Sequence, residues 1–381
     1  MSEKIIDTII IGAGIAGIGC ARKLAEQNKD FIVITEDIGG RIMASEDGLI
    51  NYGAYFVLDN YYNLLPLVKK GEKLHPFSID FHNKTGDHYH LARMFNHPVQ
   101  AVRLLSLLYG FKSKYNDFKR RCERSSQKKV IEDDTQLKKW YTQSAADYIK
   151  EENITDVVTK FLSEGVYMCT FLPLSKVSAF DFLRISLGLL IPTHEFIFLP
   201  EQATEPFKEN IIIDTVTKID KTHVFKIETN SGKKYEAHNI VLATPPHISQ
   251  KLIHLNKIKG SSNAYVFHIE GALKEEWEKG QFELFENSSS VVFIRKQKDN
   301  SYVLFSKVIK PNLQEYFIKP KVIFEKHWEP AFNITGNDLL ECKQKNGLYL
   351  IGDYNIVGME DAYITGLYVA NEILKTVYEN N

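Results

Sequence analysis

Three glycines near the start of the chain have the spacing needed to bind a dinucleotide. Gly12, Gly14 and Gly17 follow an isoleucine-rich apolar run and precede a stretch with helical periodicity. The first glycine permits a tight turn, the second lets the backbone approach a pyrophosphate, and the third lets the helix pack on the strand. The N–H groups of Ile15 and Ala16, at the predicted helix start, would face the phosphates.

A carboxylate stands at the position where a ribose hydroxyl would need an acceptor. A second apolar run over residues 31–36 ends at Glu36, about twenty residues past the glycines. Glycines before a helix also occur as plain turns without a ligand. The second strand and its acidic end favour the nucleotide, because they complete a strand, turn, helix and strand unit.

The next segment indicates which dinucleotide binds. The stretch GGRIMASEDGLINYGAYF resembles the flavin-dependent amine oxidase superfamily, which includes amine oxidases, phytoene-type desaturases and protoporphyrinogen oxidases. That family carries Gly-Gly-Arg after the ribose-binding glutamate and then an Asp-x-Gly-like segment beneath the flavin. The resemblance implies FAD rather than NAD. The cofactor contacts that it adds are Gly39, Gly40, Arg41, Tyr52, Gly53 and Ala54.

Two later segments resemble the same family. Residues 211–246 read as a strand, a hairpin turned at 230–232 and a buried strand, and residues 347–374 read as a strand followed by a helix. In the family, the first contributes a backbone contact to adenine. The second contributes contacts to the ribose, the pyrophosphate and the flavin pyrimidine edge. The residues at these positions are Val216, Gly352, Asp353, Glu360, Asp361 and Ala362.

Two of these positions carry a second interpretation. Val216 is equally compatible with an ordinary core valine, so its side chain alone proves nothing. Asp361 replaces the glycine that is usual in the family, and a carboxylate that points inward would oppose the positive helix end that stabilises negative charge on a flavin. We expect Asp361 to face solvent or to cap the helix instead.

The distribution of these motifs predicts the domain organisation. The fold class is α/β, with a Rossmann-like FAD-binding domain assembled from three segments, 1–60, 206–250 and 335–381. An α+β substrate domain, 61–205 and 251–334, is inserted between them. Where the family usually has an aromatic-Pro-Gly-Gly turn, residues 196–207 lack both glycines, so the surroundings of the flavin are expected to differ.

Composition excludes several classes of protein. A formal net charge of −1 argues against a nucleic-acid binder, and a hydrophobic fraction of 44% suffices for a sizeable core. Four scattered cysteines favour a reducing cytoplasm. The apolar N-terminus runs into the glycine turn and is read as a core strand, not a signal peptide. No uncharged apolar run is long enough to predict a transmembrane helix.

A histidine-rich hairpin raises the question of a metal site. His82, His88 and His90 lie near Asp80 and Asp87, and a His-x-His pair on a strand places both rings on one face. Surface hairpins often carry such residues, and no further ligand cluster supports a metal. We therefore predict no metal.

A strongly basic stretch follows an apolar helical one. Residues 112–129 contain Lys119, Arg120 and Arg121 among other cations. The plain interpretation is a solvated helix face. The alternative is docking on an anionic lipid surface, peripheral to a membrane, or on an acidic carrier protein.

The predicted activity is that of an FAD-dependent oxidoreductase which removes a hydride from an apolar or amine-bearing small molecule. No cysteine lies between residues 352 and 362, where covalently flavinylated relatives keep theirs, so the FAD is expected to be non-covalent. Two alternatives stay open: a redox-neutral isomerase of an unsaturated lipid or polyene, and a flavin-binding protein without turnover.

One catalytic group of many amine oxidases is missing. They place a lysine beside the flavin, and here the nearest residues, in an uncertain register, are Ala264, Tyr265 and Val266. The missing lysine predicts slow reaction with oxygen, because its charge would stabilise developing superoxide. The candidates for substrate contact are Tyr265, Trp328, Tyr363 and His247.

Overall fold

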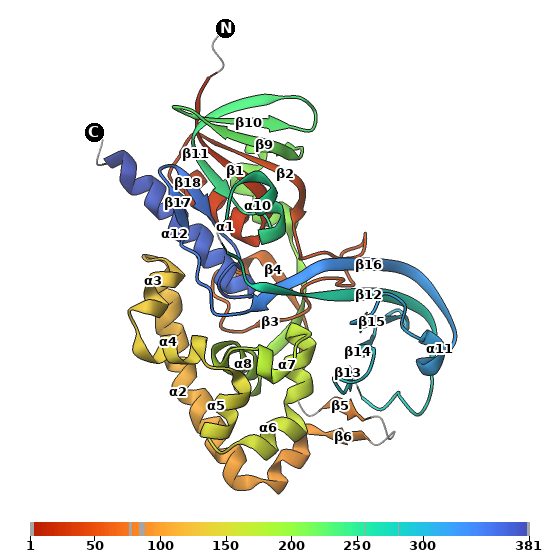
Figure 1. Ribbon diagram of the computed structural model, residues 1–381. Coiled ribbons are helices and arrows are strands. Elements are labelled where there is room, and N and C mark those ends of the chain that lie inside the picture. Colours follow the sequence, from red (N-terminus) through yellow and green to blue (C-terminus); the bar gives the residue numbers. More distant parts are fainter. Residues whose placement is uncertain (1–3, 76–77, 84–87, 256, 281, 379–381) are drawn as a thin grey trace.

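A parallel sheet with helices packed against it forms the centre of the protein, shown in Figure 1 as a computed structural model that describes residues 4–75, 78–83, 88–255, 257–280 and 282–378. In the described residues, eight strands make up this sheet, and β1 pairs in parallel with both β2 and β11. The main path runs in the order β17 (Lys343–Lys345), β18 (Leu348–Leu350), β11 (Lys234–Leu242), β1 (Ile6–Gly14), β2 (Phe31–Gly39) and β8 (Ile211–Ile213). The remaining two strands are β9 (Val216–Lys221) and β10 (Phe225–Thr229).

The apolar run of β1 is buried because the sheet is covered on both faces. Ile9 and Ile10 point to opposite faces, and both side chains are completely buried. Helices α1 (Ile15–Glu26) and α12 (Met359–Tyr378) pack closely against each other beside the sheet. A Cβ atom on Gly366 would lie 2.2 Å from the carbonyl oxygen of Ala16, so only glycine permits this helix crossing.

Two smaller sheets form the rest of the β structure in the described residues. The seven-stranded sheet runs β16 (Phe317–Thr335), β12 (Gly260–Leu273), β15 (Tyr302–Ser306), β14 (Val291–Lys296), β13 (Phe282–Phe285), β5 (Ile79–His82) and β6 (His88–His90). The three-stranded sheet runs β3 (Val57–Leu58), β7 (Thr193–Phe198) and β4 (Val68–Leu74). The predicted strand pair around residue 85 is confirmed as β5 and β6, whose connecting residues 84–87 lie outside the described residues.

A group of helices lies below the central sheet in Figure 1. They are α2 (Pro98–Cys122), α3 (Gln127–Glu132), α4 (Thr135–Thr142), α5 (Ala145–Glu151), α6 (Thr155–Phe161), α7 (Ser163–Thr170) and α8 (Ala179–Ser186). Their core is aromatic, because Phe111, Tyr115 and Phe118 of α2 each pack edge-on against Phe180 of α8, with ring centroids 5.5–5.9 Å apart. Three short helices complete the chain: α9 (Pro200–Thr204), α10 (Pro246–Leu252) and α11 (Leu313–Tyr316).

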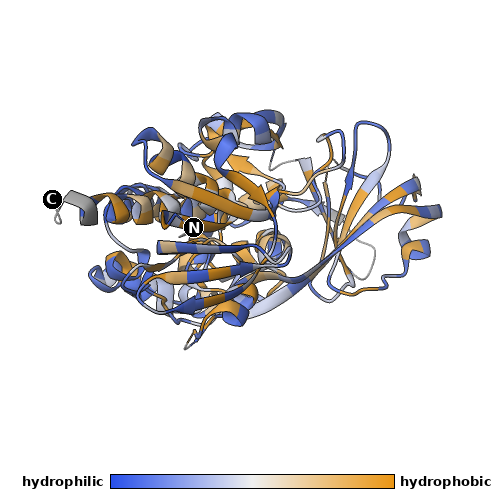
Figure 2. Ribbon diagram, turned by 90° about the horizontal axis from the view of Figure 1, so that it is seen from above, coloured by the Kyte–Doolittle hydropathy of each residue, from blue (hydrophilic) through white to orange (hydrophobic). Residues whose placement is uncertain are grey.

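The predicted α/β fold class is confirmed. All eight strands of the central sheet fall within the three segments expected to form the cofactor domain, and the helical group and the seven-stranded sheet come from the segments between them. Figure 2 shows that strands and helices alike carry both hydrophobic and hydrophilic residues. Among the described residues, no helix combines the length and the apolar character needed to cross a bilayer.

Candidate cofactor site

The glycine turn leaves the first turn of α1 free to bind an anion. Gly12 has a positive φ of 103°, and a Cβ atom there would lie 3.0 Å from the carbonyl oxygen of Ala243. A Cβ atom on Gly17 would lie only 2.0 Å from the carbonyl oxygen of Gly12, so the helix sits directly on the turn. Gly14 precedes α1 without a capping side chain, and no acidic residue occupies the first turn. The N–H groups of Ile15 and Ala16 at this end could therefore donate to a phosphate, as predicted.

The predicted ribose acceptor lies beside the predicted adenine contact. Glu36 is exposed near the end of β2, and its carboxylate accepts a hydrogen bond of 3.0 Å from the hydroxyl of Thr215. Thr215 immediately precedes β9, whose first residue, Val216, has an exposed fraction of 8%. The first and second cofactor segments thus meet at Glu36.

An ion pair joins the first and third cofactor segments. Arg41 lies 2.6 Å from Asp353, and its guanidinium also donates to the carbonyl oxygen of Ala331. Burial alone would lower the pKa of Arg41, but Asp353 outweighs it and raises this pKa above its usual value. Gly40 packs on the phosphate turn, since its Cβ atom would lie 3.2 Å from Cα of Gly14.

The segment predicted beneath the flavin folds back on Arg41. A Cβ atom on Gly53 would lie 2.0 Å from the carbonyl oxygen of Arg41, and this oxygen accepts a hydrogen bond from the N–H of Ala54. Gly39, before the arginine, has a positive φ of 100°, which permits the turn. Tyr52 is buried, and its carbonyl oxygen accepts a hydrogen bond from the indole of Trp328.

The structure corrects the expectation for Asp361. Its carboxylate is buried, with an exposed fraction of 1%, and accepts a 2.7 Å hydrogen bond from the hydroxyl of Tyr115. It neither faces solvent nor caps α12. Glu360 is also buried and accepts hydrogen bonds from the N–H groups of Asn63 and Leu64. Burial raises the pKa of both carboxyls.

Several cations of the basic stretch point inward or pair within the fold, and docking through this stretch stays a prediction. The ammonium of Lys119 is buried, donates to the carbonyl oxygen of Asn60 and lies 4.7 Å from the ring centre of Tyr62. Lys114 and Arg121 both pair with Asp134. These residues stabilise the fold of the helical group and are not available for docking.

Strand register separates the predicted substrate contacts. Ala264 pairs with Trp328 across β12 and β16, and both pack in the core cluster that contains Tyr52. Tyr265 points to the opposite face, where its hydroxyl donates to Glu329. Because side chains alternate along a strand, Tyr265 and Ala264 lie on opposite faces of the sheet, and a contact of Tyr265 with substrate stays a prediction.

The two remaining candidates lie on different elements. Tyr363 of α12 packs against α1, since a Cβ atom on Gly19 would lie 3.1 Å from its ring, and a contact of Tyr363 with substrate stays a prediction. His247 is the second residue of α10, and its Nδ1 atom is buried with no hydrogen-bond partner among the described residues. Burial lowers the pKa of His247, and Lys251 and Arg41 lower it further.

Two buried groups near these residues were not predicted. His268 binds the hydroxyl of Tyr52 at 2.8 Å and that of Ser301 at 2.7 Å. Lys259, one residue before β12, donates to the carbonyl oxygen of Asn355 in the loop that follows Asp353. No sequence pattern marked either residue, because a lone histidine in a strand or a lone lysine before one is usually exposed.

The histidine hairpin forms ion pairs rather than a metal cluster in the described residues. His82 lies 2.6 Å from Glu283, and His90 lies 3.1 Å from Asp80. Nowhere in the described residues do three or more potential ligands gather to hold a metal. Asp87 lies outside those residues, and the side chain of His88 is not described.

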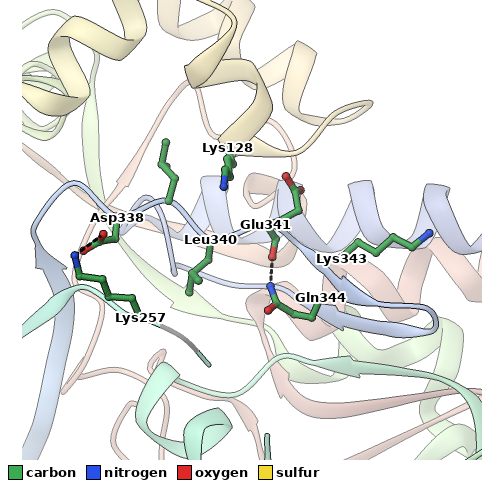
Figure 3. Close-up of a pocket in the computed structure, with 8 residues that line it drawn as sticks. Lys128, Lys257, Asp338, Leu340, Glu341, Lys343 and Gln344 are labelled. Atoms are coloured by element: carbon green, nitrogen blue, oxygen red, sulfur yellow. Dashed lines mark hydrogen bonds and ion pairs between the residues drawn. The ribbon is translucent and has the colours of Figure 1, made fainter. Parts of the chain in front are cut away.

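A surface cavity of about 330 Å³ lies apart from the predicted cofactor residues. Figure 3 shows that charged side chains dominate its lining, with Lys257 paired to Asp338 at 2.9 Å and Lys128 approaching from α3. None of its lining residues belongs to the glycine turn or to the Arg41–Asp353 pair. This cavity does not enter the argument for the cofactor.

The donor set fits a dinucleotide. The free helix end would provide N–H donors for phosphates, Arg41 would provide a positive charge, and Glu36 would provide a ribose acceptor at the strand end. The glycines leave no room for side chains at the turn itself. This combination is the cradle that a pyrophosphate requires.

Comparisons with known proteins agree with this geometry. The family model described as an NAD(P)-binding Rossmann-like domain matches residues 10–70. A search of curated proteins found no match. Among solved structures, a putrescine oxidase bound to putrescine has a TM-score of 0.67 at 12% identity, covering 98% of this chain and 99% of that one.

Two further solved structures extend the comparison. A CLA-producing fatty acid isomerase from P. acnes has a TM-score of 0.73 at 12% identity and covers 96% of this chain and 98% of that one. A putative protoporphyrinogen oxidase from Exiguobacterium sp. 255-15 has a TM-score of 0.65 at 15% identity and covers 98% and 100%. Over nearly its whole length, the chain therefore shares the fold of these solved structures, and residues 10–70 match a Rossmann-like dinucleotide-binding domain.

Proposed function

We propose that the protein is an FAD-dependent oxidoreductase that removes a hydride from an apolar or amine-bearing small molecule. The observation that carries this proposal is the meeting of three distant chain segments at the glycine turn, Glu36 and the Arg41–Asp353 pair. A bound FAD supplies hydride acceptance at its ring system. The chain's own residues bind the cofactor, orient the substrate and exclude water.

Each segment has a separate task in this proposal. The first turn of α1 binds the pyrophosphate, and Glu36 accepts a hydrogen bond from the ribose. Arg41 places a positive charge beside the phosphates, and its raised pKa keeps that charge at any physiological pH. Trp328 of the predicted substrate domain is partly buried and donates to the carbonyl oxygen of Tyr52, a buried residue of the predicted cofactor domain, so aromatic side chains lie where the two domains meet.

A redox-neutral isomerase of an unsaturated lipid or polyene is the second candidate. Two observations favour it: the similarity to a fatty acid isomerase in fold, and the small apolar Ala264 on the face that Trp328 shares. A lysine on that face would place a positive charge there for reaction with oxygen, and neither Ala264 nor Val266 can do so.

Anaerobic photometry distinguishes the candidates. FAD-loaded protein is mixed with an amine panel and an unsaturated fatty acid panel without oxygen, and the flavin absorbance and the products are followed. Lasting bleaching indicates net oxidation, whereas product without lasting bleaching indicates isomerisation. Failure to bind FAD would overturn both candidates, and FAD binding without product from any panel would favour a flavin-binding protein without turnover.

A further inference from the structure

Among the described residues, one face of α2 carries large apolar side chains that are mostly exposed. Val99, Val102 and Tyr109 have exposed fractions of 81%, 69% and 69%. Steps of three and seven residues place them in one row. The opposite face packs in the aromatic core through Ala101, Leu104, Leu108, Phe111 and Tyr115. We call Val99, Val102 and Tyr109 the outer stripe.

The same face becomes basic towards the C-terminal end of α2. Arg120 lies eleven residues after Tyr109, three full turns on, and its side chain has an exposed fraction of 76%. Arg124 follows and is also exposed. From Arg93 to Lys129 the sequence contains ten lysines and arginines against two acidic residues, in a chain with a net charge of −1.

Pairing within the fold does not remove this outward charge. Lys119 is buried, Arg103 pairs with Glu152, and Lys114 and Arg121 pair with Asp134. Lys128 lies 3.9 Å from Glu132. The remaining cations, all at least partly exposed, are Arg93, Lys112, Arg120, Arg124 and Lys129. Asp117, which lies 3.7 Å from Arg120, is the acidic residue on this side of α2 itself.

We propose that the outer stripe docks on an anionic lipid bilayer, with its apolar residues among the acyl chains near the headgroups and Arg120 and Arg124 on the lipid phosphates. A bilayer surface satisfies both halves of the face, because it offers hydrocarbon to the apolar residues and negative charge to the arginines. This inference does not depend on the cofactor or on the reaction.

A second copy of the chain satisfies the face less well. Parallel pairing of two stripes would bring Arg120 against its own counterpart, and antiparallel pairing would lay Arg120 on the apolar half of the other copy. Neither arrangement buries Val99 and Val102 while it neutralises the arginines. An acidic protein would neutralise them, but it would need an apolar groove matched to a row of protruding side chains.

The test is co-sedimentation of the full-length, FAD-loaded protein with vesicles at low salt. Vesicles of phosphatidylcholine alone are compared with vesicles of equal parts phosphatidylcholine and phosphatidylglycerol. The stripe variant is Val99→Ser, Val102→Ser and Tyr109→Ser combined. Its matched control is Leu49→Ser with Ile213→Ser, which removes apolar side chains exposed by 63% and 65% elsewhere on the surface.

A second pair of variants tests the charge. Arg120→Gln with Arg124→Gln is compared with Lys257→Gln with Lys321→Gln, whose side chains are exposed by 72% and 71% on other parts of the molecule. Far-UV circular dichroism and FAD content verify that each variant folds.

The expected result is that the wild type and both controls pellet with the anionic vesicles and not with phosphatidylcholine alone. The stripe variant should bind roughly tenfold more weakly or worse, and each arginine removed should weaken binding about fivefold. Wild type that stays in the supernatant at low salt overturns the proposal. So does a stripe variant that pellets like the wild type, or a wild-type dimer in sedimentation velocity that the stripe variant abolishes.

Discussion

The hydroxyl of Tyr115 donates a 2.7 Å hydrogen bond to the carboxylate of Asp361, and this contact ties the helical group to the first turn of α12. Both side chains are buried, with exposed fractions of 1%. Arg184 lies on the same side of α12, since a Cβ atom on Gly358 would lie 3.2 Å from its guanidinium and 2.6 Å from Asp361. The first turn of α12 is predicted to face the cofactor. The helical group of the predicted substrate domain therefore fixes the position of this turn.

Removing that hydroxyl should destabilise the fold. Tyr115→Phe leaves the buried carboxylate without its donor, at a cost of about 1–3 kcal/mol in the free energy of unfolding. Urea unfolding followed by circular dichroism measures the change. Tyr109→Phe makes the same substitution on the same helix at a side chain exposed by 69%, and it should have almost no effect. Equal stabilities of the two variants would show that the hydrogen bond contributes little.

The Asp361 carboxyl should also make stability depend on pH. Burial raises its folded pKa above the value in the unfolded chain, so its stabilising contribution is complete below about pH 4 and is lost as the pH rises through the folded pKa. Asp361→Asn removes this dependence. From acidic to neutral pH, the unfolding free energy of the variant should therefore increase relative to that of the wild type. A difference that stays constant over this range would contradict the raised pKa.

Lys259 should produce the opposite trend at alkaline pH. Burial lowers its pKa to about 8, well below that of an unfolded lysine, so its contribution rises with pH above 8 and is lost as the pH falls through 8. Relative to Lys259→Met, the wild type should gain stability above pH 8 with a slope of up to about 1.4 kcal/mol per pH unit. Lys257→Met, two residues away and exposed, should give a flat difference. Parallel curves for the two variants would refute the prediction.

Loss of the Glu36 carboxylate should weaken FAD binding. Glu36→Ala removes the predicted ribose acceptor, a charge-assisted contact of about 1.5–3 kcal/mol, which corresponds to roughly a tenfold to hundredfold loss of affinity. Glu46→Ala, also exposed in the first cofactor segment, is the control. Titration of apoprotein with FAD, followed by flavin fluorescence, gives both affinities. Unchanged affinity of Glu36→Ala would remove this residue from the site.

Bound FAD should be released by acid. No cysteine lies between residues 352 and 362, where a covalent bond to the flavin is predicted to form if one exists, so acid precipitation should leave the flavin in the supernatant. Flavin in the pellet would contradict this expectation.

Reduced FAD in this protein should react slowly with oxygen, because Ala264, and not a lysine, lies on the face shared with Trp328. Stopped-flow mixing of photoreduced protein with oxygen measures the rate of reoxidation. A rate as fast as in lysine-bearing amine oxidases would contradict this prediction.

The sequence by itself determined the cofactor half of the protein. The glycine turn, the strand that follows it and the helix at residue 359 could be predicted because each depends on local rules: φ freedom at Gly12, the period of buried strands and the apolar spacing of a helix. These rules act within about twenty residues, so their effects can be recognised in the amino-acid sequence alone. The α/β class followed from their order along the chain.

Only the tertiary structure decided which side chains meet. The register that pairs Ala264 with Trp328 places Tyr265 on the opposite face, and a shift of one residue would have reversed the two faces. Asp361 and Lys119 are polar residues whose burial depends on partners more than fifty residues away, Tyr115 and Asn60. A sequence pattern cannot contain such pairs, because the cost of burying a charge is offset only by a partner that the fold brings to it.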